Sequence, residues 1–133
     1  GQSGAQDLVT LLDELNAYTF SVIVDAATVD FMTGLSARST RDGVLAMMLF
    51  VETYLRVARV SHPADYEKIL SSSAAELVVV LWDRAEGSLA FAGTDPRLGI
   101  QDRQIRSSVI SQENLSEIER IRSVVSPRVV IAR

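Results

Sequence analysis

The fold is decided by residues 44–60, which read VLAMMLFVETYLRVARV. The first half of this stretch has no polar side chain, and charged groups enter only in the second half. A helix that is apolar all round is one that neighbouring elements enclose. The stretch therefore predicts a helix over Val44–Val60 at the centre of the molecule.

Two further segments carry the three- and four-residue spacing of apolar side chains that is typical of amphipathic helices. They cover residues 7–34 and 63–89. Because the connections at 35–41 and 61–63 are short, the helices that they join are expected to be antiparallel neighbours. The sequence therefore predicts an all-α fold, an antiparallel bundle of three long helices.

Local signals mark where helices begin and end. Ser61, two residues before Pro63, is typical of an N-cap. Asn114–Glu117 has the form of a capping box, and Pro127 is expected to end the helix that follows it. A weak helical pattern also covers residues 101–110. One or two short C-terminal helices are therefore expected after the three long ones.

An alternative fold remains open because short apolar runs do not distinguish a helix from a buried strand. Such runs lie near residues 19–24, 77–82 and 128–132. If they are strands, the fold is α+β and not all-α.

Length and charge limit the class of protein. The chain has 133 residues, which is one domain, and residues 1–6 and 127–133 are expected to be loosely held ends. The net charge is −4 and the pI about 4.9, with no basic cluster of the kind that nucleic-acid binders carry. No run reaches the roughly 18 apolar residues that a transmembrane helix needs. We therefore expect neither nucleic-acid binding nor a transmembrane segment.

The residue types also restrict the chemistry. With no Cys and one His, the chain lacks a thiol nucleophile, a disulfide framework and the usual ligands of a zinc site. It contains no Gly-rich phosphate loop and no EF-hand pattern. We therefore predict no catalytic residue, no metal and no cofactor, and we expect that the protein is not an enzyme.

The sequence says little about the cellular location and the source of the protein. It begins Gly-Gln-Ser-Gly, which is typical of a processed or tagged N-terminus, and a cytoplasmic and a periplasmic location both stay open. Its thirteen basic residues are twelve Arg and one Lys, a bias that suggests a bacterial source with a GC-rich genome.

A polar stripe crosses the central stretch. Glu52, Arg56 and Arg59 are four and then three residues apart, so they lie on one side of the expected helix. The preferred interpretation is a solvent-exposed stripe with an ordinary Glu–Arg pair. The alternative is an internal ion-pair network or the polar lining of a cavity.

A second group of residues is the best sequence-based location for a binding site. Arginines and one tryptophan precede and follow the Gly93–Pro96 break, and guanidinium groups beside an indole could accept a carboxylate or phosphate. These candidate binding residues are Trp82, Arg84, Arg97, Arg103 and Arg106. The preferred interpretation, however, is that the arginines pair with the acids Asp83, Glu86, Asp95 and Asp102.

Three other polar residues are interpreted structurally. Asp25 and Asp30 are five residues apart, so they do not converge on a helix, and we expect them to be solvent-facing or salt-bridged. His62 precedes Pro63 at a helix start and is expected to shape a surface turn.

The apolar content suggests a function. Mean hydropathy is +0.18, although the chain has no membrane span, and a small domain has a limited interior. Some of a set of large side chains are therefore expected to be buried only by a partner; the set is Phe31, Met32, Met47, Met48, Phe50 and residues 129–131. We expect a non-catalytic helical interaction module that binds a protein partner or self-associates through an apolar helix surface. The alternative is a small-molecule binding or sensor domain with an apolar interhelical pocket and an Arg-rich rim for an anionic ligand.

Overall fold

The regular elements are all helical. A computed structural model describes residues 4–31 and 38–132, and these residues contain no strand. The predicted all-α class is confirmed. In chain order the elements are α1 (Gly4–Thr28), the 3-10 helix η1 (Val29–Phe31), α2 (Thr40–Ser61), α3 (Pro63–Ser71), α4 (Ser73–Ala92), the 3-10 helix η2 (Pro96–Leu98), α5 (Asp102–Val109) and α6 (Gln112–Ala132).

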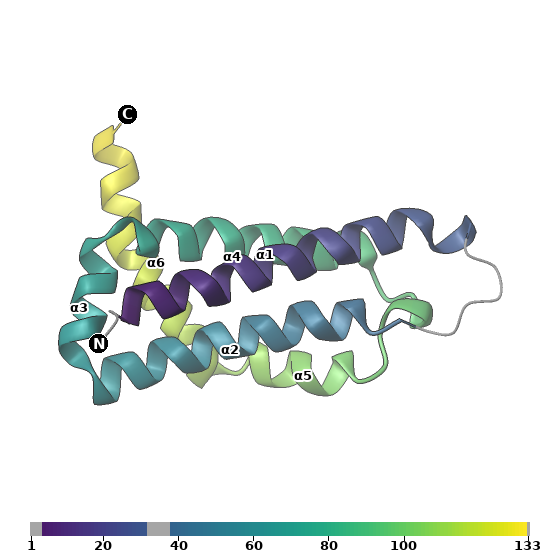
Figure 1. The fold of residues 1–133 in the computed structure, drawn as a ribbon, viewed down its shortest axis with the longest axis horizontal. Coiled ribbons are helices and arrows are strands. Elements are labelled where there is room, and N and C mark those ends of the chain that lie inside the picture. Colours follow the sequence, from purple (N-terminus) through teal and green to yellow (C-terminus); the bar gives the residue numbers. More distant parts are fainter. Residues whose placement is uncertain (1–3, 32–37, 133) are drawn as a thin grey trace.

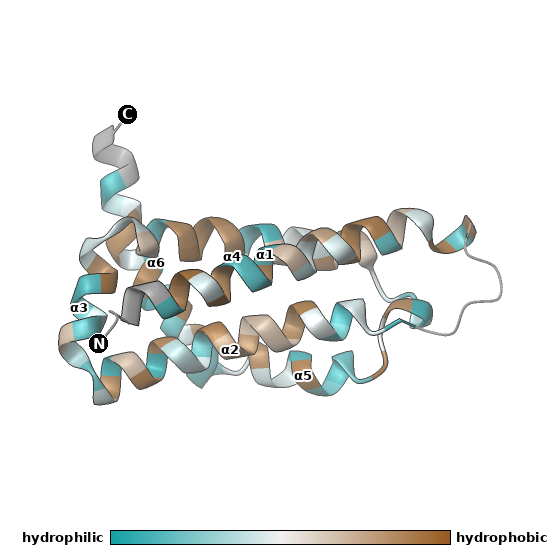
Figure 2. Cartoon of the chain, viewed as in Figure 1, coloured by the Kyte–Doolittle hydropathy of each residue, from teal (hydrophilic) through white to brown (hydrophobic). Residues whose placement is uncertain are grey.

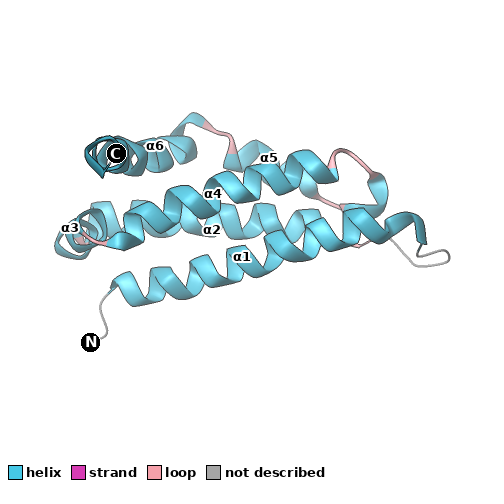
Figure 3. Cartoon of the chain, turned by 90° about the horizontal axis from the view of Figure 1, so that it is seen from above, coloured by secondary structure: helices cyan, strands magenta, loops and turns pink. Residues whose placement is uncertain are grey.

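The helices are arranged around α2 and α4. Figure 1 shows that α1 and α4 run in the same direction and that α2 runs opposite to both. Seen from above, α2 and α4 lie between α1 on one side and α5 with α6 on the other (Figure 3). Helix α5 packs along α2, and α6 packs against both α4 and α2.

The core lies where the apolar stripes of these helices meet. Hydrophobic residues recur along α1, α2 and α4 in Figure 2, and the buried ones form one cluster. Helix α2 packs against each of the other five α-helices of the described chain, as its composition predicts. The largest fully buried apolar side chains are Trp82, Leu8, Leu12, Leu15, Leu45, Met48, Leu55, Ile69, Leu98, Ile118 and Ile121.

The expectation that α2 is enclosed on all sides is wrong. Phe50, Val57 and Val60 are exposed, and their spacing places them on one outer stripe of the helix. Conversely, Met47 and Met48 are buried by the chain itself and need no partner. The residues of α2 that meet α5 and α6, among them Arg41, Arg56 and Arg59, lie on a different side of the helix, so the outer stripe stays exposed.

The predicted helix over 63–89 is two helices. Helix α3 ends at Ser71 and α4 begins at Ser73, because Ser72 is extended at φ −106° and ψ 171°. Its side-chain oxygen accepts a hydrogen bond from the Ala74 amide at 3.2 Å, which is an N-cap. From α6, the Arg128 guanidinium donates hydrogen bonds to the carbonyls of Leu70 and Ser72. The break is therefore stabilised from both sides.

The predictions for the last helix were wrong at both ends. Helix α6 begins at Gln112, so Asn114–Glu117 is its first turns and not a capping box. It continues through Pro127 to Ala132. Proline removes one backbone donor, but a helix can continue past it at the cost of a kink.

The strand alternative is also wrong, since 19–24, 77–82 and 128–132 are helical. Thr19 and Val22 are buried while Phe20 and Ile23 are exposed, which is a helical pattern and not the alternation of a strand.

Two helix ends differ from expectation in detail. His62, and not Ser61, is the N-cap of α3, with Pro63 in the first position. Helix α1 ends at Thr28 and continues as η1 to Phe31, whereas the predicted end at Gly34 lies outside the described residues. The weak helix expected over 101–110 is confirmed as α5.

Candidate functional site

An apolar stripe lies on the outer side of α1. Phe20 is 69% exposed and Phe31 85% exposed, and Ile23 lies between them at helical spacing. The opposite side of the same helix carries the buried leucines of the core. Helix α1 is therefore apolar over an arc wider than the chain itself can cover.

Helix α4 extends this stripe into a surface. Val80 and Phe91 are exposed on α4, and Arg84 between them donates a hydrogen bond from Nη1 to Asn16 Oδ1 on α1 at 3.0 Å. Because the two helices run in parallel, this contact places Phe91 about level with Ile23. We call the surface formed by Phe20, Ile23, Phe31, Val80 and Phe91 the α1–α4 face.

The α1–α4 face is hollowed near its middle. A shallow depression of about 490 Å³ is lined by Asn16, Ala17, Thr19, Phe20, Ile23 and Arg84. An apolar surface with a hollow and a few polar groups at the centre resembles the buried core of a protein–protein interface.

The structure does not gather the five predicted binding residues at one place. Arg84 lies on the α1–α4 face, while Arg97 is held by Asp95 at 2.6 Å and by Asp30 at 2.9 Å. The hydrogen bonds from Arg97 lower the pKa of Asp95 to about 2, and both acids raise the pKa of Arg97. For Arg97, the expected pairing with acids is confirmed.

Trp82 and Arg106 do come together. Trp82 is buried, and its indole Nε1 donates a hydrogen bond to Glu86 Oε1 at 2.8 Å. Both Trp82 and Arg106 line a cavity of about 260 Å³ between α2, α4, α5 and α6. The other lining residues are Met48, Glu86, Leu89, Ala90, Val109, Ile110 and Leu115.

A polar hollow of about 450 Å³ borders this cavity, and Arg106 lines both. Arg103 and Arg106 line it together with Arg41, Asp102 and the loop residues Thr94, Pro96, Gly99 and Ile100. We call the cavity and this hollow together the Arg106 site. The side chains of Arg103 and Arg106 make no hydrogen bond or ion pair with the residues that the structure describes.

Arg41 anchors the loop that forms this hollow, and sequence analysis missed it. Its side chain is only 3% exposed. It donates to Asp102 Oδ2 at 2.8 Å and to the carbonyls of Gly93 and Asp95, each at 3.0 Å. Burial raises the pKa of Asp102, but the hydrogen bond and charge of Arg41 outweigh it, so the pKa is lowered. No local signal marks Arg41, because all its partners lie more than fifty residues away.

The expectation of an exposed Glu52–Arg56–Arg59 stripe is wrong for Glu52, which is fully buried. Neither carboxylate oxygen of Glu52 has a hydrogen-bond partner among the described residues. Burial raises the pKa of Glu52 to about 8; the charge of Arg56 opposes this rise, and that of Glu117 adds to it. The carboxyl group is therefore largely protonated at neutral pH.

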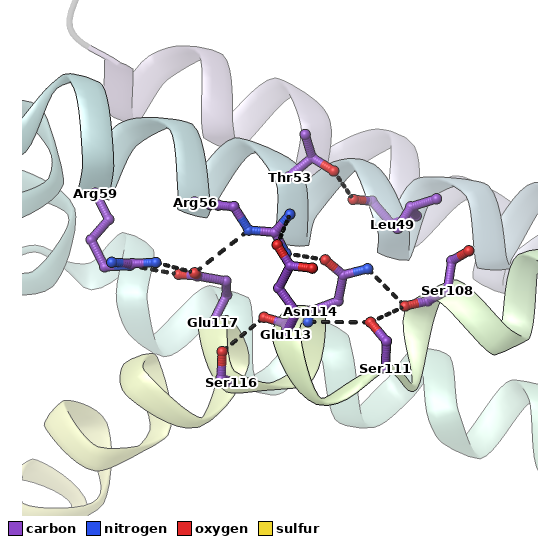
Figure 4. A network of polar contacts seen from close by, with 10 residues as sticks. All are labelled: Leu49, Thr53, Arg56, Arg59, Ser108, Ser111, Glu113, Asn114, Ser116 and Glu117. Atoms are coloured by element: carbon purple, nitrogen blue, oxygen red, sulfur yellow. Dashed lines mark hydrogen bonds and ion pairs between the residues drawn. The ribbon is translucent and has the colours of Figure 1, made fainter.

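The two arginines of the stripe join α2 to α6, as Figure 4 shows. Arg59 binds Glu117 through both guanidinium branches, with Nε to Oε2 at 3.1 Å and Nη2 to Oε1 at 2.6 Å. Arg56 lies 3.8 Å from the same carboxylate and donates a hydrogen bond to Asn114 Oδ1. Arg56 and Arg59 thus belong to an ion-pair network between α2 and α6, whereas Glu52 takes no part in it. Glu117 was missed as its centre, because it was assigned to a capping box.

The other three polar candidates, Asp25, Asp30 and His62, have structural roles. Asp25 binds Arg38 at 2.8 Å, and Asp30 binds Arg97, so both are salt-bridged as expected. His62 is exposed at the turn between α2 and α3, as expected. Within residues 4–31 and 38–132, no three His, Cys, Asp or Glu side chains are grouped so that they could hold a metal ion.

In the same part of the chain, no helix is long and apolar enough to cross a bilayer. Comparison with known proteins gives no family: no family model, no curated protein and no solved structure matches the chain.

Proposed function

We propose that the protein is a non-catalytic helical interaction module that associates through the α1–α4 face, either with a partner protein or with a second copy of itself. The observation that carries the proposal is the combined exposure of Phe20 on α1, Phe31 on η1, which continues α1, and Phe91 on α4. Aromatic side chains contribute strongly to binding energy because they bury large areas with few rotatable bonds.

The chemistry of the face supports association in preference to catalysis. Arg84 and Asn16 bind each other in its middle, and all five residues that define it are apolar. Such a surface offers apolar area and a small central polar contact, which suits a partner helix or loop.

The outer stripe of α2 is a competing surface, but it is narrower. Phe50, Val57 and Val60 come from one helix, and Thr53 interrupts them. The α1–α4 face combines two helices with a depression, so we place the association there.

A pair of variants tests this choice. Phe20→Glu places a charge in the α1–α4 face, and Phe50→Glu places the same charge on the outer stripe of α2. Sedimentation equilibrium over a wide concentration range measures self-association, and capture from an extract of the native host measures association with a partner. We expect Phe20→Glu to abolish whichever association the wild type shows and Phe50→Glu to preserve it. The reverse pattern, or a wild type that neither self-associates nor captures a partner, would contradict the proposal.

A further inference from the structure

The Arg106 site shares no residue with the α1–α4 face or with its depression. Arg106 lines both of its hollows, the apolar cavity of about 260 Å³ and the polar hollow of about 450 Å³. It is therefore the group at which an apolar surface and a charged surface meet.

The cavity is apolar on most sides. Met48 comes from α2, Leu89 from α4, Val109 from α5 and Leu115 from α6, so four helices contribute to its wall. The indole of Trp82 also lines it, held by its hydrogen bond to Glu86. Small-molecule sites are commonly concave, mostly apolar and equipped with a few convergent polar groups.

The charges of the site favour an anion at one end. Arg41 is engaged with Asp102 and two backbone carbonyls, so it has little capacity for a ligand. Arg103 and Arg106 are not engaged by any described acid, although the charge of Arg106 helps to lower the pKa of Asp102. A guanidinium group offers a planar, bidentate arrangement of donors that matches a carboxylate.

We propose that the Arg106 site binds an apolar monocarboxylate, with its carboxylate at Arg106 and its hydrocarbon body in the cavity. Glu86 also lines the cavity, and its charge repels an anion, so the carboxylate of the ligand is directed toward Arg106 and not toward Glu86. The cavity volume lies just below the usual range of about 300–1,000 Å³ for small-molecule pockets, so the ligand is small. Octanoate and 3-phenylpropionate are suitable probes of this size.

Two measurements test the proposal. Equilibrium dialysis with radiolabelled octanoate or 3-phenylpropionate measures affinity and stoichiometry. The fluorescence of Trp82, the single tryptophan of the chain, reports whether the bound acid lies in the cavity. We expect one saturable site for at least one acid, with a dissociation constant of about 1 mM or tighter, and a change in Trp82 emission that follows its occupancy.

Matched variants locate the site. Arg106→Gln removes the charged partner, and Ala90→Phe fills the cavity from its exposed rim; each is expected to weaken binding about tenfold or more. Arg84→Gln removes the same charge on the α1–α4 face and is expected to leave binding unchanged. Octanamide, the neutral analogue, is expected to bind at least about tenfold more weakly than octanoate.

Circular dichroism confirms that each variant is folded. The proposal is overturned if neither acid binds with 1:1 stoichiometry. It is also overturned if octanamide binds as well as octanoate, or if both Arg106→Gln and Ala90→Phe bind like the wild type.

Discussion

Glu52 is an acid in the middle of the core, on the face of α2 that meets α6. Its burial costs less when the carboxyl group is protonated, which is why its pKa is raised to about 8. In the unfolded chain, the pKa of Glu52 returns to its ordinary value of 4.5. The contribution of Glu52 to stability is therefore fully present below pH 4.5 and is lost as the pH rises toward 8.

Replacing Glu52 with glutamine removes this dependence. We expect Glu52→Gln to unfold with the same free energy as the wild type near pH 4 and to be more stable at pH 8. The wild type loses up to about 1.4 kcal/mol per pH unit between these limits, and the variant does not. Urea denaturation at several pH values measures the difference, and parallel pH curves for the two proteins would contradict it.

Arg41 differs from Glu52, since its buried charge is paired with Asp102 and hydrogen-bonded to two backbone carbonyls. Arg41→Ala leaves Asp102 and two carbonyls without their donor, and we expect a loss of about 3–5 kcal/mol in the free energy of unfolding. Arg103→Ala is the control, because Arg103 is exposed and contacts no described acid; its effect is expected within about 0.5 kcal/mol. Equal effects of the two substitutions would contradict the role of Arg41.

Sequence reasoning at this scale succeeded where a residue's partners are close along the chain and failed where they are distant. Arg97 pairs with Asp95 two residues away, and this pairing was predicted. Arg41, and Glu117 with Arg59, find partners more than fifty residues away, and their burial depends on packing that spacing does not encode.

Two glycines show how helix elements approach one another. A Cβ atom at Gly43 on α2 would lie 2.5 Å from the Tyr18 ring on α1, whereas one at Gly87 on α4 would have no neighbour within 4 Å. Helices α1 and α2 thus meet closely at Gly43, and Gly87 has no packing role in the chain itself.

The same substitution is therefore expected to act in opposite directions. Gly87→Ala should stabilise the protein by about 0.5–1 kcal/mol through helix propensity. Gly43→Ala should destabilise it, because the Tyr18 ring must move. Thermal unfolding measures the effects of Gly87→Ala and Gly43→Ala. In a Tyr18→Ala background, Gly43→Ala should no longer destabilise the protein, because the ring is absent. Stabilisation by Gly43→Ala alone would contradict the close approach.

The junction between α3 and α4 depends on one serine. Ser72→Ala removes the N-cap of α4 and is expected to cost about 1 kcal/mol. Ser71→Ala is a matched control, because the Ser71 hydroxyl only bonds back to the carbonyls of Glu67 and Lys68 in its own helix. Denaturant unfolding of the two variants distinguishes them, and an equal loss in both would contradict the assignment of the cap.

Helices were predictable where the pattern of apolar residues is long and regular. The residues at which the helices begin and end were harder to predict. The spacing over 7–34 and 44–60 predicted α1 and α2. The break at Ser72 was missed because three consecutive serines interrupt the pattern without Gly or Pro. The continuation of α6 through Pro127 could not be read from local signals, since Pro127 alone indicates a stop.

At the scale of the whole molecule, the all-α class follows from periodicity, but the surface follows from packing. Helix α2 packs against five helices, and apolar residues of α1, α4 and the outer stripe of α2 still stay exposed. The prediction that Phe31 and Phe50 need a partner is consistent with their exposure, whereas Met32 lies outside the described residues. The side chains of 129–131 are likewise not described. Which apolar residues stay exposed depends on how the helices cross. The spacing of apolar residues along the sequence does not determine the crossing.

The most direct test of association through the α1–α4 face is a photo-crosslinking scan in the native host. A benzophenone side chain is placed in turn at exposed positions on α1, on α4 and on the outer stripe of α2. The account predicts crosslinks from positions 20, 23, 80 and 91, to a partner or to a second 14.5 kDa chain, and none from positions 50, 57 and 60. Crosslinks confined to the α2 positions, or spread equally over both surfaces, would contradict it.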